Sequence, residues 1–240
     1  MKQSGRYAVI FIAAMALWNT IIIKPLKILS VFFHELGHSL MAVIFGNGIA
    51  GFRIYFNESG YARTLPKDWF SAFIIANGGY LGSVLFALLI LKLKKTQARK
   101  YILGACAILL LGMSIAYGDS FFTVIYAAIF AGFVIIIYML RNDRINDWAT
   151  DIIGVVCAVY AVYDTFVDTI LLEINRKIGL IPDWGAARPA TDVVQLEMMT
   201  KVPAVVWGVI WFIIACCAVY STMLGGKKRS SGSRSRRTAA

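Results

Sequence analysis

The sequence predicts an all-α polytopic membrane protein with about six or seven transmembrane helices and a small β-hairpin after the helix that carries an H-E-x-x-H motif. Three observations lead to this fold class. Hydrophobic residues make up 59% of the 240 residues and charged residues only 15%, with a mean hydropathy of +0.71, which excludes an ordinary soluble domain. The apolar residues gather in runs of roughly 17–25 residues, long enough to cross a bilayer. Positive charges concentrate in short segments between these runs.

The net charge of +11 would suit a nucleic-acid-binding protein, but its distribution favours a membrane protein without a nucleic-acid partner. Residues 92–100, KLKKTQARK, hold five positive charges and no negative one. The basic low-complexity segment 225–240 follows the last apolar run, and we expect a disordered tail there. The positive-inside rule places both segments, including the C-terminal tail, in the cytoplasm. Residues 1–224 then form a single integral membrane domain.

The first apolar run, residues 7–23, allows two interpretations. Ala14-Met15-Ala16 resembles a signal-peptide cleavage site, but cleavage there would leave too short an apolar core, so we favour a retained helix. Pro25 suits the first turn of the next helix. The polar segment 141–148 is interpreted as a linker. The further predicted spans cover residues 25–46, 69–91, 101–117, 121–140, 151–172 and 202–224.

The second span contains the H-E-x-x-H motif, as His34, Glu35 and His38 within SVFFHELGHSLMAVIFG. Two histidines four residues apart leave the same face of a helix and can share one tetrahedral metal ion. Glu35 lies on an adjoining face, where it can act as a general base on water without being a ligand. The alternative is a buried helix with two hydrogen-bonded histidines. Ionisable groups are costly in a bilayer, which favours the catalytic zinc site.

A catalytic zinc needs at least one further protein ligand, and the chain has no third histidine. The four cysteines lie inside apolar runs without Cys-x-x-Cys spacing and are interpreted as packing residues. Asp164 and Asp168 share a face of the sixth predicted span, at the depth of a membrane-embedded site. We therefore predict Asp164 as the metal ligand. Asp168 would be a second ligand or an acceptor that orients a histidine N–H group.

Two further features could serve a substrate. Residues 49–65 alternate aromatic and β-branched with polar residues around the turn Asn57-Glu58-Ser59-Gly60, which predicts a β-hairpin. Its exposed edge could pair with an extended peptide, or the segment could be a structural or re-entrant loop. Asn77 lies in the middle of the third span and could donate to a substrate carbonyl or a ligand carboxylate; alternatively, it forms a helix-to-helix hydrogen bond. Asp119 is expected to cap the fifth helix.

Together these segments resemble the site-2 protease superfamily of intramembrane zinc metallopeptidases, and more specifically its peptidase M50B-like membrane proteins. The resemblance rests on F-H-E-L-G-H-S-L, the hairpin behind it, N-G-G-Y-L-G-S, the Tyr-Asp-x-x-x-Asp segment ending at Asp168, and the run from Pro203 to Trp211. It implies Zn²⁺ at His34 and His38, Glu35 as base and acid, and an aspartate of the later helix as third ligand.

The resulting expectation is a zinc metalloendopeptidase that hydrolyses peptide bonds of membrane-embedded or membrane-proximal substrates, as in regulated intramembrane proteolysis. Its partners would be a membrane protein or peptide substrate and the lipid bilayer. One alternative is a catalytically inactive scaffold that binds partners and retains the metal site. A metal-ion transporter would require more than one cluster of ligands along a pathway, and the sequence contains a single such cluster.

Overall fold

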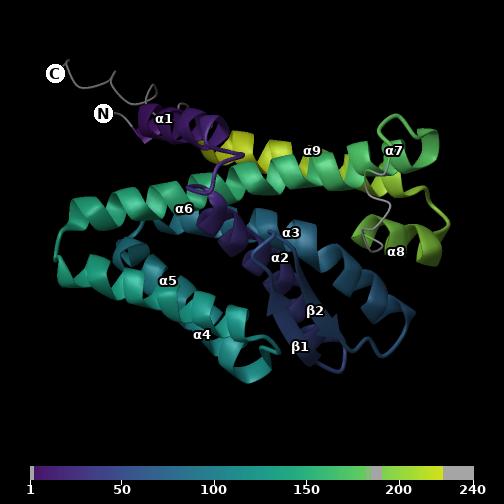
Figure 1. Cartoon of the computed structure of the whole chain (residues 1–240), viewed down its shortest axis with the longest axis horizontal. Helices are drawn as coiled ribbons and strands as arrows, with labels where there is room; N and C mark the ends of the chain where they lie inside the picture. Colours follow the sequence, from purple (N-terminus) through teal and green to yellow (C-terminus); the bar gives the residue numbers. More distant parts are fainter. Residues whose placement is uncertain (1–2, 183, 185–190, 224–240) are drawn as a thin grey trace, which may run out of the picture.

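The protein is a multi-pass helical bundle with one small sheet (Figure 1). The computed structural model describes residues 3–182, 184 and 191–223. Its helices are α1 (Gln3–Ala16), α2 (Lys24–Phe45), α3 (Trp69–Leu93), α4 (Ile102–Tyr117), α5 (Phe121–Met139), α6 (Asp143–Asp164), α7 (Leu172–Ile178), α8 (Asp192–Thr200) and α9 (Ala204–Met223). A 3₁₀ turn η1 (Gln97–Tyr101) precedes α4, a π-helical segment η2 (Thr165–Leu171) joins α6 to α7, and the strands are β1 (Ile49–Ile54) and β2 (Gly60–Thr64).

Six helical stretches among the described residues are long and apolar enough to cross a membrane, which confirms the predicted fold class. They cover residues 24–45, 69–93, 97–117, 121–139, 143–178 and 204–222. The polar segment 141–148 was predicted as a linker, but most of it is the first part of α6. Asn142 caps this helix by accepting hydrogen bonds from the backbone N–H groups of Arg144 and Ile145. The helical stretch that starts at Asp143 continues through η2 and α7 for 36 residues.

The first apolar run does not form a spanning helix. Helix α1 has 14 residues, about 21 Å at 1.5 Å per residue, against a hydrocarbon core of about 30 Å. It ends because Thr20 turns the chain, with both its backbone N–H and its hydroxyl donating to the carbonyl of Leu17. Trp18 then packs against Tyr160 and Tyr163 of α6. The run 7–23 is therefore a short helix followed by turns.

Helices α2 and α3 approach each other through glycines. A Cβ atom on Gly37 would lie 2.1 Å from the carbonyl oxygen of Gly78, and one on Gly82 would lie 2.7 Å from the Cα of Gly37. Such contact between backbones is typical of small-residue interfaces between membrane helices. It holds the motif-bearing face of α2 directly against α3.

The predicted β-hairpin is present, with β1 and β2 antiparallel and Phe52 opposite Ala62. The outer edge of β1 is covered by the turn between α4 and α5, where Phe52 forms a parallel bridge with Gly118. The other edge of the hairpin, that of β2, faces α2. At the tip, Glu58 forms an ion pair with Lys27 near the start of α2.

Asp119 fastens the hairpin to the α4–α5 turn instead of capping α5, a role taken by Ser120. Its carboxylate accepts hydrogen bonds from Arg53 Nε at 2.7 Å, the Tyr61 hydroxyl at 2.6 Å and Arg63 at 3.0 Å. Burial by itself would raise the pKa of Asp119, but these hydrogen bonds and guanidinium charges lower it below its ordinary value.

This cluster predicts a pH-dependent stability. Because the pKa of Asp119 is lower in the folded state, its stabilisation is fully present above the unfolded-state pKa of about 3.9 and is lost as the pH falls toward the folded-state pKa. We expect Asp119→Asn to lower the thermal unfolding midpoint at neutral pH, with the difference from wild type shrinking below about pH 4. Thermal unfolding in detergent across this range measures the effect. Asp143→Asn is the control, because the Asp143 side chain is 89% exposed; an equal shift in both variants would contradict the assignment.

Candidate metal centre

The two motif histidines converge on one point beside α3. Their Nε2 atoms lie 3.1 Å apart. The Nδ1 atom of His38 lies 2.7 Å from the carbonyl oxygen of Ile75, which can only accept, so Nδ1 carries the proton and Nε2 is free to act as a ligand. The His34 ring packs edge-on against Tyr80, with ring centroids 4.7 Å apart. Packing and hydrogen bonding thus fix both imidazoles.

The third member of the cluster is Asp192. Its Oδ2 atom lies 3.2 Å from Nε2 of His34 and 3.1 Å from Nε2 of His38. Ligand atoms about 2.0–2.2 Å from a tetrahedral zinc are separated by about 3.3 Å, so the three atoms have the spacing of a shared metal ion. We call His34, His38 and Asp192 the metal group; it is the set of potential ligands that the described part of the chain brings together.

Asp192 reaches the histidines because α8 folds back onto the bundle. Val193 and Leu196 of this helix are fully buried and pack in a cluster with Ala76 and Tyr80 of α3. Burial by itself would raise the pKa of Asp192, but the adjacent His38 and His34 hold it well below its ordinary value. The carboxylate is therefore in the ionised form that metal ligation requires.

Asp164 and Asp168, the predicted third ligands, lie outside the metal group. Asp164 ends α6, Asp168 lies in η2, and the Asp164 side chain is hydrogen-bonded to Tyr160 and to Asp168. The prediction assumed that only a residue of a spanning helix could reach the depth of the histidines. The structure instead brings a carboxylate to them from α8, a short helix between the spans.

Glu35 is buried beside the metal group without belonging to it. The backbone N–H of Ala62 in β2 lies near its carboxylate, and a Cβ atom on Gly60 would come within 3.0 Å of its Cγ. Glu35 therefore points from the motif helix toward the β2 edge of the hairpin. This is a suitable position for a base that acts on a neighbouring water molecule.

Asn77 makes the helix-to-helix contact that was the second interpretation of its role. Its amide nitrogen donates to the carbonyl of Phe73 at 2.9 Å, and its oxygen accepts from the indole of Trp211 in α9 at 3.0 Å. Trp211 in turn stacks on Tyr80, which packs against His34. Asn77 thus supports the wall of the metal centre through two aromatic side chains.

Gly79 keeps the space in front of the histidines open, a role that the sequence did not reveal. A Cβ atom at this position would lie 2.3 Å from Nε2 of His38 and 2.4 Å from Nε2 of His34. These are the two nitrogen atoms that face Asp192. Only glycine at this position leaves the volume in which a shared ion fits.

A model of the family described as Peptidase M50B-like matches residues 7–222 of the chain. No curated protein and no solved structure matches it. The match covers all three residues of the metal group, Glu35 and the hairpin.

Proposed function

The chain belongs to the Peptidase M50B-like family, and on this basis we propose that it is an intramembrane zinc metalloprotease that cleaves membrane-embedded or membrane-proximal substrates. The observation that carries the proposal is the convergence of His34, His38 and Asp192 on one point, with Glu35 beside them. Two imidazoles and one carboxylate are a ligand set typical of hydrolytic zinc sites.

We assign the roles as follows. His34, His38 and Asp192 hold the ion, and His38 is oriented by its hydrogen bond to Ile75. Zinc, when bound, would polarise the scissile carbonyl and lower the pKa of the attacking water. Glu35 takes the proton of that water and passes it to the leaving amine.

The hairpin is proposed to hold the substrate in extended form. Helical backbone is internally hydrogen-bonded, so a substrate helix must unwind before its peptide bond can be attacked. The outer edge of β1 is covered by the α4–α5 turn, whereas β2 lies against Glu35 through Ala62. A strand added to β2 would therefore run beside the base.

Membrane proteomes of cells that produce wild type or Glu35→Gln protein test the proposal. We expect Glu35→Gln to reduce cleavage by about 10²–10⁴-fold, so that uncleaved substrates accumulate and their fragments disappear. The matched control is Glu197→Gln, at a glutamate that accepts a hydrogen bond from the backbone of Ala204 at the start of α9. Identical proteomes for wild type and Glu35→Gln would favour the inactive scaffold.

A further inference from the structure

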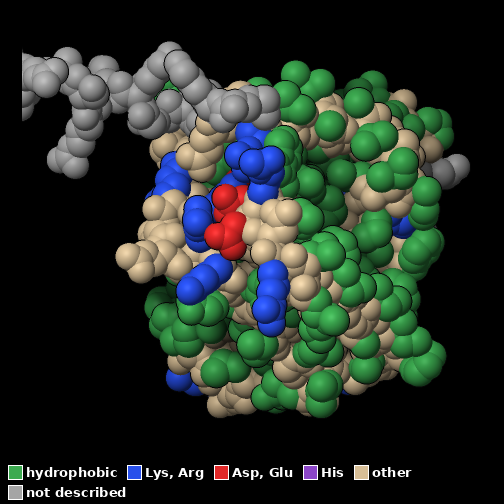
Figure 2. Space-filling model, turned by 90° about the vertical axis from the view of Figure 1, so that its left-hand side faces the viewer, with side chains coloured by type: hydrophobic (Ala, Val, Ile, Leu, Met, Phe, Trp, Pro, Cys, Tyr) green, Lys and Arg blue, Asp and Glu red, His purple; other side chains and the backbone are tan. Residues whose placement is uncertain are grey.

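A basic cavity of about 920 Å³ opens at the end of the bundle where α3 ends and α6 begins. We call it the basic cavity; it is lined by Gln3, Arg6, Lys94, Lys95, Thr96, Gln97, Arg99, Lys100, Asp143 and Asp147. Five of these side chains are cationic and two are anionic. Figure 2 shows Lys and Arg side chains gathered around a few acidic ones on this face.

The basic cavity lies where helices that are long and apolar enough to span a membrane end. Its lining residue Lys94 directly follows the spanning helix α3, which ends at Leu93, and α4 begins at Ile102. Lys95 donates to the carbonyl of Thr222 near the end of α9, at 3.4 Å. Because three spans end around it, a ligand can reach this cavity directly from the headgroup layer.

A buried carboxylate positions two of the cations. Asp151 of α6 is fully buried and forms ion pairs with Arg6 at 2.7 Å and with Lys94. The guanidinium of Arg6 also lies over the ring of Trp148, 4.7 Å from its centroid, and its buried Nε has no hydrogen-bond partner. A buried charge is costly unless it is paired. The buried Asp151 carboxylate therefore holds Arg6 and Lys94 at fixed places in the cavity wall.

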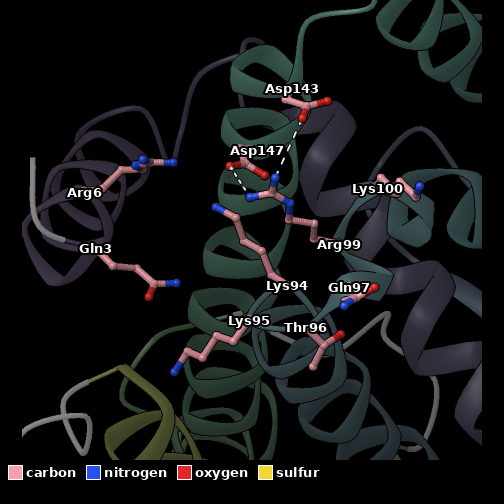
Figure 3. Close-up of a pocket in the computed structure, with 10 residues that line it drawn as sticks. All are labelled: Gln3, Arg6, Lys94, Lys95, Thr96, Gln97, Arg99, Lys100, Asp143 and Asp147. Carbon is pink, nitrogen blue, oxygen red and sulfur yellow. Dashed lines mark ion pairs between the residues drawn. The ribbon is translucent and has the colours of Figure 1, made fainter.

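Other donors face the same space. In Figure 3, Gln3, Arg6 and Lys94 point into the gap between α1 and α6, and Lys95 points into the lower part of the same gap, on the side of α9. Lys100 points away from them, and Arg99 is turned toward Asp143 and Asp147, 3.7 Å from each. The convergent set thus combines three cations with an amide, a donor arrangement that suits phosphate oxygens.

We propose that the basic cavity binds the phosphorylated headgroup of an anionic lipid. Convergent Lys and Arg side chains at the membrane surface between helices select such headgroups. The volume lies in the range of about 300–1,000 Å³ usual for small-molecule sites, which exceeds the size of a single phosphate and accommodates a phosphorylated sugar. Because α1, α3 and α6 all contribute to the wall, bound lipid would join these helices at this end of the bundle.

Microscale thermophoresis on the full chain in neutral detergent tests the proposal, with a short-chain phosphatidylinositol monophosphate as the probe. We expect Lys95→Gln to weaken binding about tenfold, because it removes a charged donor from the convergent set. Lys92→Gln is the matched control: it removes the same charge from the same end of α3, outside the lining residues, and should change affinity by less than about twofold. Lys95→Arg, which keeps the charge, should retain binding.

Three outcomes would overturn the proposal. Equal losses of affinity in Lys95→Gln and Lys92→Gln would show that binding depends on general surface charge and not on the basic cavity. If the wild type bound short-chain phosphatidylcholine as tightly as the phosphatidylinositol monophosphate, the phosphomonoester would not be the recognised group. This comparison needs no variant. Binding of the free inositol phosphate as tight as that of the lipid would make the ligand a soluble one.

Discussion

Asp192→Ala protein is expected to lose its zinc on purification, with metal affinity reduced by more than about 100-fold, whereas Asp164→Ala and Asp168→Ala keep it. Loss of a residue that only orients a metal ligand already lowers metal affinity by about 10–100-fold. Because Asp192 would be a ligand itself, its loss should cost more. Its Oδ2 atom is 3.1–3.2 Å from both histidine Nε2 atoms, and neither Asp164 nor Asp168 belongs to the metal group. Elemental analysis of the purified variants measures the metal content.

The three aspartate variants serve as controls for one another. Each removes one half-buried carboxylate, and thermal unfolding in detergent shows whether each variant is folded. Full zinc in Asp192→Ala together with loss in Asp164→Ala would instead assign the third ligand to the end of α6. That result would reject α8 as the ligand donor while leaving His34 and His38 in place.

Gly79→Ala is expected to abolish zinc binding almost completely in a protein that still folds. The added methyl group would come within 2.3–2.4 Å of both histidine Nε2 atoms, so the imidazoles must move away from the position in which they share an ion. In a helix interior alanine is favoured over glycine by about 1 kcal/mol, so the helix itself is not weakened. Metal content, measured beside the far-ultraviolet circular dichroism spectrum, separates the two effects.

Gly112→Ala is the matched control for Gly79→Ala. It makes the same substitution in another spanning helix, α4, at an exposed position where an added Cβ meets nothing within 4 Å. Its zinc content should equal that of the wild type. Full zinc binding in Gly79→Ala would show that the ion lies elsewhere than between His34, His38 and Asp192.

Local patterns predicted the elements whose structure is set by local chemistry. The turn at Asn57-Glu58-Ser59-Gly60 gave the hairpin within a residue or two of β1 and β2. The spacing of His34 and His38 gave a shared face on α2, because helical geometry determines it. The predicted spans 69–91 and 121–140 agree with α3 and α5 to within two residues.

The positions of Asp192 and Asp119 depend on tertiary contacts, which local sequence patterns do not show. Asp192 lies 154 residues after His38 in the chain, in a polar stretch that nothing in the sequence pattern brings near the histidines. Its position depends on Val193 and Leu196 being buried against α3. These residues are three positions apart in VVQLEMM, a spacing that places them on one face of a helix. Asp119 likewise pairs with Arg53 and Arg63 of the hairpin. Rules for helix caps consider only neighbouring residues and could not predict these contacts.

Metal content and cleavage, measured together on purified and reconstituted wild type and Glu35→Gln protein, test the central claim most directly. We predict about one zinc per chain in both, because Glu35 is not part of the metal group, and cleavage of a transmembrane substrate by the wild type alone. Removal of zinc by a chelator should stop cleavage, and its return should restore it. Absence of metal from both proteins, or cleavage by Glu35→Gln at the wild-type rate, would contradict the proposed metalloprotease.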